Sequence, residues 1–195
     1  KRPEEGWTEF ETTWFIAKRL KALGLQVTIG KANICESEVL GRDPVLVSDA
    51  MKRAAAHGVP EDFLKATEGY TGAVARFDTG KPGPTTAFRS DIDCVLVRET
   101  DNPEHLPNKL GFASERPGFM HAGHDGHTAV GLAVAHWLVM NKDRLCGRFI
   151  LIFQPAEEGV RGARAMAASG LVDHVDYFLG GHVGGDAKLG EIAVM

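Results

Sequence analysis

The stretch Arg148-Phe149-Ile150-Leu151-Ile152-Phe153 decides the fold of this chain of 195 residues. It is an almost continuous apolar run, which is typical of a strand buried on both faces of a sheet. Two segments that precede it along the chain, at 7–23 and 125–140, have apolar residues at spacings of three and four and predict amphipathic helices. Strands and helices that alternate around a doubly buried strand predict an α/β fold, with a mixed central sheet and helices on both faces.

Other short segments have the length and composition of strands. They are residues 25–29, 72–78, 85–89 and 175–179, and a last strand is expected to begin at 192–194. The turn-forming residues of 78–84 predict a hairpin that pairs the second strand with the third.

Capping residues predict further helices, one that begins at Asp43 or Ser48 and ends near His57, and a short one opened by Pro60. The helix at 125–140 is expected to bury the face formed by Ala129, Leu132, Ala133, His136, Trp137 and Met140. Another short helix is expected at 162–168. Residues 98–120 hold three prolines, two glycines and many charges, and predict a long surface loop.

The composition narrows the class of protein. There are 22 Lys and Arg against 26 Asp and Glu, a formal net charge of −4, and no basic run, so a nucleic-acid partner is not expected. No apolar run approaches the roughly 20 residues of a membrane span. The three cysteines, Cys35, Cys94 and Cys146, are widely spaced, which favours a reducing cytoplasm over a disulfide scaffold and predicts small buried side chains.

Histidines cluster at one point of the sequence. Met120-His121-Ala122-Gly123-His124-Asp125-Gly126-His127 contains three of the eight histidines and an aspartate, at the start of the predicted 125–140 helix. Imidazole and carboxylate groups are preferred ligands of Zn²⁺ and Mn²⁺. The cluster therefore indicates a metal site, against the alternative that Asp125 caps the helix and the histidines form a polar surface.

Acidic residues and a histidine follow three of the predicted strands. Asp91 and Asp93 follow one, Glu157 and Glu158 follow the buried strand, and His182 follows the 175–179 strand. Adjacent glutamates can divide two tasks, one binding metal and the other taking a proton from water. The alternative for the glutamates is a solvated acidic start to the next helix, and a lone histidine is more often structural. The convergence of ligand-type residues at strand ends favours a site.

Several stretches of the chain also match recognisable motifs. They are Glu5–Phe10, Thr79–Pro84, Phe88–Asp93, Gly123–Ala129, Phe153–Gly159, Arg161–Met166 and Val175–Phe178. Together they cover nearly the whole chain and resemble the metal-dependent amidohydrolases of the aminoacylase and glutamate-carboxypeptidase superfamily, with the aminobenzoyl-glutamate hydrolase type the most similar.

The resemblance implies a role for individual residues. His124, Glu158 and His182 would bind two divalent cations, Zn²⁺, Mn²⁺ or Co²⁺, and Glu157 would be the general base. The resemblance implies that Glu157 takes a proton from the water that attacks the amide carbon and passes it to the leaving amine. Asp93 would orient a ligand, and the further residues that could contribute are Asp91, His121 and Asp125.

The same resemblance implies a substrate and partners. The reaction would release an amino acid such as glutamate from an N-acyl or N-aroyl conjugate such as p-aminobenzoyl-glutamate. The substrate is a small molecule, neither nucleic acid nor a membrane is a partner, and the full-length protein is expected to be a dimer or hetero-oligomer.

The chain departs from the family pattern in two ways. The family motif reads His-Ala-Cys-Gly-His-Asp with the cysteine as a metal ligand, whereas here Ala122 is followed directly by Gly123. Either that ligand is deleted or a modified cysteine is omitted from the sequence. Family members are also about twice as long, so residues 1–195 are expected to be the N-terminal part of the catalytic metal-binding domain, without the dimerisation or lid domain and the C-terminal return that supplies a last histidine.

Two other classes of function stay open on the sequence. One is a non-catalytic fragment or binding module that keeps the pocket but lacks the full ligand set. The other is a domain that binds a single metal through His121, His124 and His182.

Overall fold

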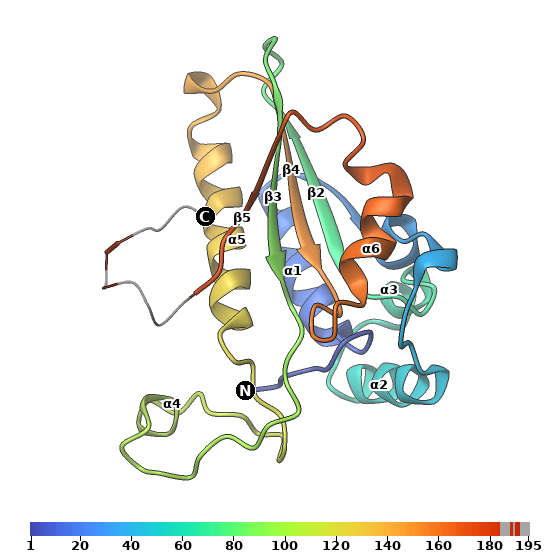
Figure 1. Ribbon diagram of the computed structural model, residues 1–195, viewed down its shortest axis with the longest axis vertical. Helices are drawn as coiled ribbons and strands as arrows, with labels where there is room; N and C mark the ends of the chain where they lie inside the picture. The colour runs from blue at the N-terminus through green and yellow to red at the C-terminus, as the bar shows by residue number, and fades with distance from the viewer. Residues whose placement is uncertain (184–187, 189, 192–195) are drawn as a thin grey trace.

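A five-stranded mixed sheet forms the centre of the computed structural model, which describes residues 1–183, 188 and 190–191 (Figure 1). The strands run in the order β1-β2-β4-β3-β5. Their bounds are β1 Gln26–Ile29, β2 Ala73–Asp78, β3 Thr85–Asp91, β4 Arg148–Gln154 and β5 Tyr177–Gly180. β3, β4 and β5 are mutually parallel, whereas β2 is antiparallel to both of its neighbours, β1 and β4. The predicted α/β class and mixed sheet are confirmed, and the strand expected at 192–194 lies outside the described residues.

The apolar strand β4 lies in the middle of the sheet. Its side chains alternate between two apolar clusters, with Leu151 and Phe153 on one face and Ile152 on the other. β2 does the same with Ala73 and Val74. Because successive side chains of a strand point to opposite faces, a run without polar residues requires cover on both sides.

Helices supply this cover on both faces, as predicted. α1 Phe10–Ala22 and α5 His124–Met140 pack on the face of Leu151, and α2 Pro44–Ala56, α3 Glu61–Ala66 and α6 Gly162–Met166 pack on the opposite face (Figure 1). The shorter elements are α4 Leu106–Lys109, η1 Gly30–Asn33, η2 Glu36–Glu38, η3 Lys142–Arg144 and the π-helical turn η4 Ala167–Leu171. The edge strand β5 is the exception, since its residues are exposed.

The predicted hairpin between β2 and β3 is wrong. β4 lies between them, antiparallel to β2 and parallel to β3. Their connection crosses the start of β4, where the backbone N–H and the hydroxyl of Thr79 donate to the Gly147 carbonyl at 3.2 and 2.8 Å. A Cβ atom on Gly147 would lie 2.1 Å from the Pro84 carbonyl oxygen. The composition of the 78–84 turn indicates that the chain reverses direction between β2 and β3. It does not indicate which strand pairs with each of them.

The predicted buried face of α5 is also wrong. The buried residues are His124, His127, Thr128, Gly131, Ala135 and Leu138, whereas Trp137 and Met140 are 55% and 73% exposed. Gly131 explains the difference, because a Cβ atom there would lie 2.6 Å from Ser90 Oγ and 2.9 Å from Phe153 Cε1. The helix approaches the sheet most closely at its small residues, and its largest side chains, Trp137 and Met140, face outward.

Smaller predictions have mixed outcomes. Asp43 caps α2, with its Oδ1 accepting the Val45 amide at 2.7 Å. The 98–120 segment contains the short helix α4 and is closed at its base by pairing of Val95 with Met120. All three cysteines are free, but Cys35 is half-buried and Cys146 is exposed in the turn before β4, so burial holds for Cys94 alone. Among the described residues, no helix is both long and apolar enough to cross a membrane.

Candidate metal centre

The candidate site lies where the carboxyl ends of β3, β4 and β5 meet. Because these strands are parallel, Asp91, Gln154 and Gly180 end them at the same edge of the sheet. α5 begins at this edge with His124. The segments that follow the strands carry the motifs singled out in the sequence, and the carboxyl edge of a parallel sheet is where α/β proteins place ligands.

His124 is the centre of the first group of possible ligands. It is buried, its Nδ1 lies 3.1 Å from Asp93 Oδ1, and its Nε2 lies 3.8 Å from both Glu157 Oε2 and Glu158 Oε1. One ligand atom from each of His124, Glu157 and Glu158 lies within 4.8 Å of the others. Nδ1 is thus oriented by the Asp93 carboxylate, while Nε2 faces the carboxylates of Glu157 and Glu158. This arrangement is common in metal-binding histidines.

The site stabilises positive charge. Burial alone would lower the pKa of His124, but the hydrogen bond with Asp93 and the charges of Asp91, Asp93 and Glu157 outweigh it and raise that pKa to about 9. A proton therefore stays on the imidazole at neutral pH when no cation is bound. A divalent cation would replace that proton, and the mixed nitrogen and oxygen donors suit Zn²⁺ or Mn²⁺.

Asp93 joins the two halves of this group. Its Oδ1 faces His124, and its Oδ2 accepts the backbone N–H of Glu158 at 2.9 Å. Asp93 is fully buried, so water does not compete for either contact. These contacts are compatible with the orienting role that the family resemblance implies for Asp93, which stays a prediction.

A second group joins Asp91, His124 and His127. His127 Nδ1 lies 2.6 Å from Asp91 Oδ1, while its Nε2 accepts the Val183 backbone N–H at 2.8 Å, so Nδ1 carries the proton that Asp91 accepts. Sequence reasoning counted His127 in the histidine cluster but gave it no role. The available signal was helical spacing, because residues three apart, such as His124 and His127, share a face of α5.

Arg89 is the other residue that sequence reasoning missed. Its guanidinium lies 2.9 Å from Asp91 Oδ2 and 3.8 Å from Glu157 Oε1, and its Nε donates to Gln154 Oε1 at 2.8 Å. It thus ties the ends of β3 and β4 to the candidate base. Arg89 ends the predicted 85–89 strand and lies in the Phe88–Asp93 motif, but sequence reasoning gave it no role.

Besides Asp93, three residues proposed from the sequence lie outside both groups. His182 is exposed, with its ring 4.8 Å from that of His127. His121 is half-buried, and its Nδ1 has no hydrogen-bond partner among the described residues. Asp125 is exposed, and its Oδ1 accepts the adjacent Gly126 amide at 3.0 Å. The structure therefore brings together His124, Glu157, Glu158, Asp91 and Asp93.

The alternatives to a site receive less support from the geometry. Glu157 and Glu158 are half-buried in a turn that precedes α6, so they do not form the solvated start of that helix.

Ala122 and Gly123 both have left-handed φ values, 53° and 101°, directly before α5. In the sequence as it stands, this segment offers the site a buried imidazole, that of His124, and no thiolate.

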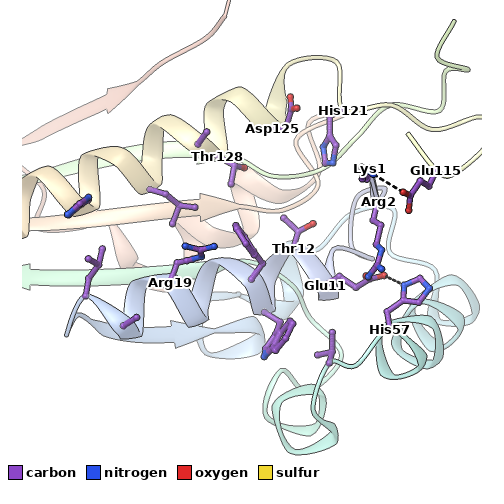
Figure 2. A pocket seen from close by; sticks show the side chains of 18 residues that line it. Lys1, Arg2, Glu11, Thr12, Arg19, His57, Glu115, His121, Asp125 and Thr128 are labelled. Atoms are coloured by element: carbon purple, nitrogen blue, oxygen red, sulfur yellow. Dashed lines mark hydrogen bonds and ion pairs between the residues drawn. The ribbon is translucent and has the colours of Figure 1, made fainter. Parts of the chain in front are cut away.

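A hollow of about 1210 Å³ lies beside the site, between α1 and α5 (Figure 2). His121 and Asp125 lie at one end of it, and Glu11 bonds to His57 at 2.8 Å across another part (Figure 2). His124, Glu157 and Glu158 do not line it. The hollow is therefore adjacent to the possible ligands without containing them.

An α/β domain with imidazole and carboxylate groups at the carboxyl edge of its sheet has the donor groups that metal-dependent hydrolases use. Residues 87–195, more than half of the chain, match the family model described as peptidase family M20/M25/M40. The chain belongs to this family.

Individual relatives agree with this assignment. A p-aminobenzoyl-glutamate hydrolase subunit homolog of Haemophilus influenzae is 52% identical over 192 residues, which are 97% of this chain and 45% of that protein. The crystal structure of an aminobenzoyl-glutamate utilization protein from Klebsiella pneumoniae superposes with a TM-score of 0.75 at 41% identity, over 95% of this chain and 41% of that one.

A dinuclear metal-binding peptidase of the M20 family from Bacillus subtilis superposes with a TM-score of 0.69 at 28% identity, over 95% of this chain and 40% of that one. The chain spans less than half the length of the curated relatives it matches.

Proposed function

We propose that the protein is a metal-dependent amidohydrolase that releases an amino acid such as glutamate from an N-acyl or N-aroyl conjugate such as p-aminobenzoyl-glutamate. The observation that carries this proposal is the position of His124 Nε2, 3.8 Å from each of two adjacent glutamates. The names of the most similar relatives support the choice of conjugate.

The imidazole and carboxylate groups of the site can hold a divalent cation, and we propose that two cations bind. His124, Glu158 and His182 would hold them, with Zn²⁺ and Mn²⁺ the candidates that this donor set favours. When bound, the cations would polarise the amide carbonyl and lower the pKa of water. His182 is the ligand that the described residues support least, because it is exposed beside His127.

Glu157 would act as the general base. Its Oε1 faces the Arg89 guanidinium at 3.8 Å, which leaves Oε2, on the side of His124, to accept the proton of the attacking water. The same oxygen would then return the proton to the leaving amide nitrogen. The side chain is 36% exposed, so a substrate can reach it.

Substitution of the base tests this assignment. In the full-length protein, Glu157→Ala is expected to lower kcat for p-aminobenzoyl-glutamate hydrolysis by about 10²–10⁴-fold, the range for a lost general base. The metal content, measured by elemental analysis, is expected to equal that of the wild type. Glu158→Ala is the matched control, which should lose metal and activity together.

Metal loss in Glu157→Ala would make Glu157 a ligand and contradict the assigned role. A wild-type protein that binds metal but hydrolyses neither N-aroyl nor N-acyl glutamates would favour a binding module, the second class considered for this chain.

The organisation of the whole protein is also part of the proposal. We propose that residues 1–195 form the N-terminal part of the catalytic domain, and that the full-length protein has a dimerisation or lid domain and assembles as a dimer or hetero-oligomer. The word subunit in the name of the Haemophilus influenzae relative supports an assembly. The three free cysteines support a cytoplasmic location.

A further inference from the structure

Glu9 lies fully buried beneath the turn that carries Glu157 and Glu158. Its Oε1 accepts the backbone N–H of Ala156 at 2.8 Å, and its Oε2 accepts the hydroxyl of Thr71 at 2.6 Å. Glu9 directly precedes α1, 147 residues before Ala156 in the chain. The contact therefore connects the N-terminal segment to the candidate site.

Ala156 has an uncommon backbone conformation. Its φ is +49°, in the left-handed region that residues with a Cβ atom seldom occupy and that persists where neighbouring contacts impose it. Its carbonyl oxygen accepts the amides of Arg161 and Gly162 at 3.2 and 2.8 Å. The Glu9 bond to its N–H completes the set of hydrogen bonds that hold this residue.

The turn also has little room to move. A Cβ atom on Gly6 would lie 2.8 Å from Ala156 Cα, and one on Gly162 would lie 1.8 Å from the Pro155 carbonyl oxygen. Two glycines thus let the surrounding chain close tightly around Pro155 and Ala156. The direction in which the next two residues leave the turn is fixed by these contacts.

We infer that Glu9 is a positioning residue, which holds the Ala156 amide and so sets the directions of Glu157 and Glu158. Asp93 holds the Glu158 amide in the same way at 2.9 Å. Two buried carboxyl groups therefore hold alternate amides on either side of Glu157. The consequence for hydrolysis rests on the proposed function, whereas the consequence for the backbone does not.

Burial, together with the nearby charge of Asp93, raises the pKa of Glu9 to about 8. When the carboxyl group is neutral, one oxygen still accepts the Ala156 N–H and the other still accepts the Thr71 hydroxyl. Glutamine keeps an oxygen that can accept the Ala156 N–H, and its N–H group can instead donate to the Thr71 hydroxyl oxygen, so Glu9→Gln is expected to preserve the contact with Ala156. Glu9→Leu removes both polar atoms at similar volume and leaves the buried Ala156 N–H without an acceptor.

Glu4 supplies a matched control. It is also fully buried, and its carboxyl group accepts the amides of Glu11 and Thr12 at 3.2 and 2.8 Å. These contacts lie within the start of α1, away from the turn at Ala156. Glu4→Leu therefore removes a similar carboxyl group without touching the candidate site.

Hydrogen exchange of the full-length protein in the presence of a chelator tests the backbone role. Peptides covering residues 154–162 are expected to exchange at least tenfold faster in Glu9→Leu than in the wild type. Glu9→Gln and Glu4→Leu are expected to exchange in this region at the wild-type rate. If Glu9→Leu does not fold, Glu9→Asp tests the backbone role instead. The shorter side chain cannot reach both Ala156 and Thr71, so residues 154–162 should also exchange faster in Glu9→Asp.

A Co²⁺ titration followed by visible absorption tests the effect on the site. Glu9→Leu is expected to weaken Co²⁺ binding about tenfold, at the low end of the ~10–100-fold cost of losing an orienting partner, and Glu9→Gln to restore it. Wild-type exchange in both Glu9→Leu and Glu9→Asp would overturn the inference, as would equal deprotection in Glu4→Leu. A wild-type protein that neither binds Co²⁺ nor hydrolyses conjugates would refute the proposed function, while the exchange data would still decide the role of Glu9.

Discussion

The buried carboxyl group of Glu4 caps the start of α1 from outside the helix. It accepts the amides of Glu11 and Thr12, which have no partner within the first turn, and the hydroxyl of Thr12. Burial raises the pKa of Glu4 to about 7, although the hydrogen bonds from Thr12 oppose this change. The group is thus partly protonated near neutral pH.

The raised pKa predicts a pH-dependent stability. The folded state binds a proton at Glu4 that the unfolded chain releases near pH 4.5, so this stabilisation is full below pH 4.5 and is lost as the pH rises through about 7. The loss is at most about 3 kcal/mol. Glu4→Gln is expected to reduce the fall in the free energy of unfolding between pH 5 and 8, measured by urea denaturation with a chelator present. Part of the pH dependence is expected to remain in Glu4→Gln, because Glu9 also has a raised pKa. A fall in the free energy of unfolding equal to that of the wild type would contradict the prediction.

The residues of the site were predicted to different extents. Asp91 and Asp93 lie two residues apart and contact His127 and His124 respectively, so the period of an extended chain was enough to place them on one side. Glu9 and Arg89 could not be found in this way, because they act through contacts with segments 147 and 65 residues away. The roles of His124, Glu157, Glu158 and His182 remain predictions from the family resemblance.

α5 shows how an element can be predicted correctly and oriented wrongly. Its apolar periodicity gave the helix, but Trp137 and Met140 suggested a face that is exposed. The buried face contains Gly131 and Ala135. Such small residues contribute little to the apolar pattern of the sequence, which large side chains dominate. A helix that packs closely on a sheet selects small residues at the contact, and this selection depends on the opposing side chains.

The close packing at Gly131 predicts the cost of a single methyl group. Gly131→Ala would normally favour a helix by up to about 1 kcal/mol, but the new Cβ atom would meet Ser90 Oγ at 2.6 Å. The free energy of unfolding is expected to fall by about 1–3 kcal/mol. Gly126→Ala, where the nearest atom is 3.6 Å away, is the control and should be neutral or stabilising. Equal effects at the two positions in chemical denaturation would rule out the proposed contact.

At the scale of the whole molecule, the site joins segments that are far apart in the sequence. The ends of β3 and β4 and the start of α5 meet at one edge of the sheet. The sequence indicated this meeting, because ligand-type residues followed three of the predicted strands. The strand order could not be predicted, because nothing in the 78–84 turn indicates that β4 lies between β2 and β3.

Because a cation held by His124 and Glu158 would link the start of α5 to the turn after β4, its removal is expected to destabilise the full-length protein. At a free metal concentration of 100 times Kd, the stabilisation is about 2.7 kcal/mol. Thermal unfolding with and without a chelator measures it. His124→Ala should abolish the difference, whereas His136→Ala, an exposed histidine of the same helix, should retain it. A chelator effect that survives in His124→Ala would place the cation elsewhere.

The insertion of β4 between β2 and β3 has a consequence for the nascent chain. β2 and β3 are complete by residue 91, but the strand that pairs with both begins only at Arg148. During synthesis their facing edges have no partner until about 60 further residues have emerged, and pairings of such long sequence separation form slowly. Exposed strand edges promote association between chains. During this interval, the edges of β2 and β3 that later pair with β4 are open to association with other chains.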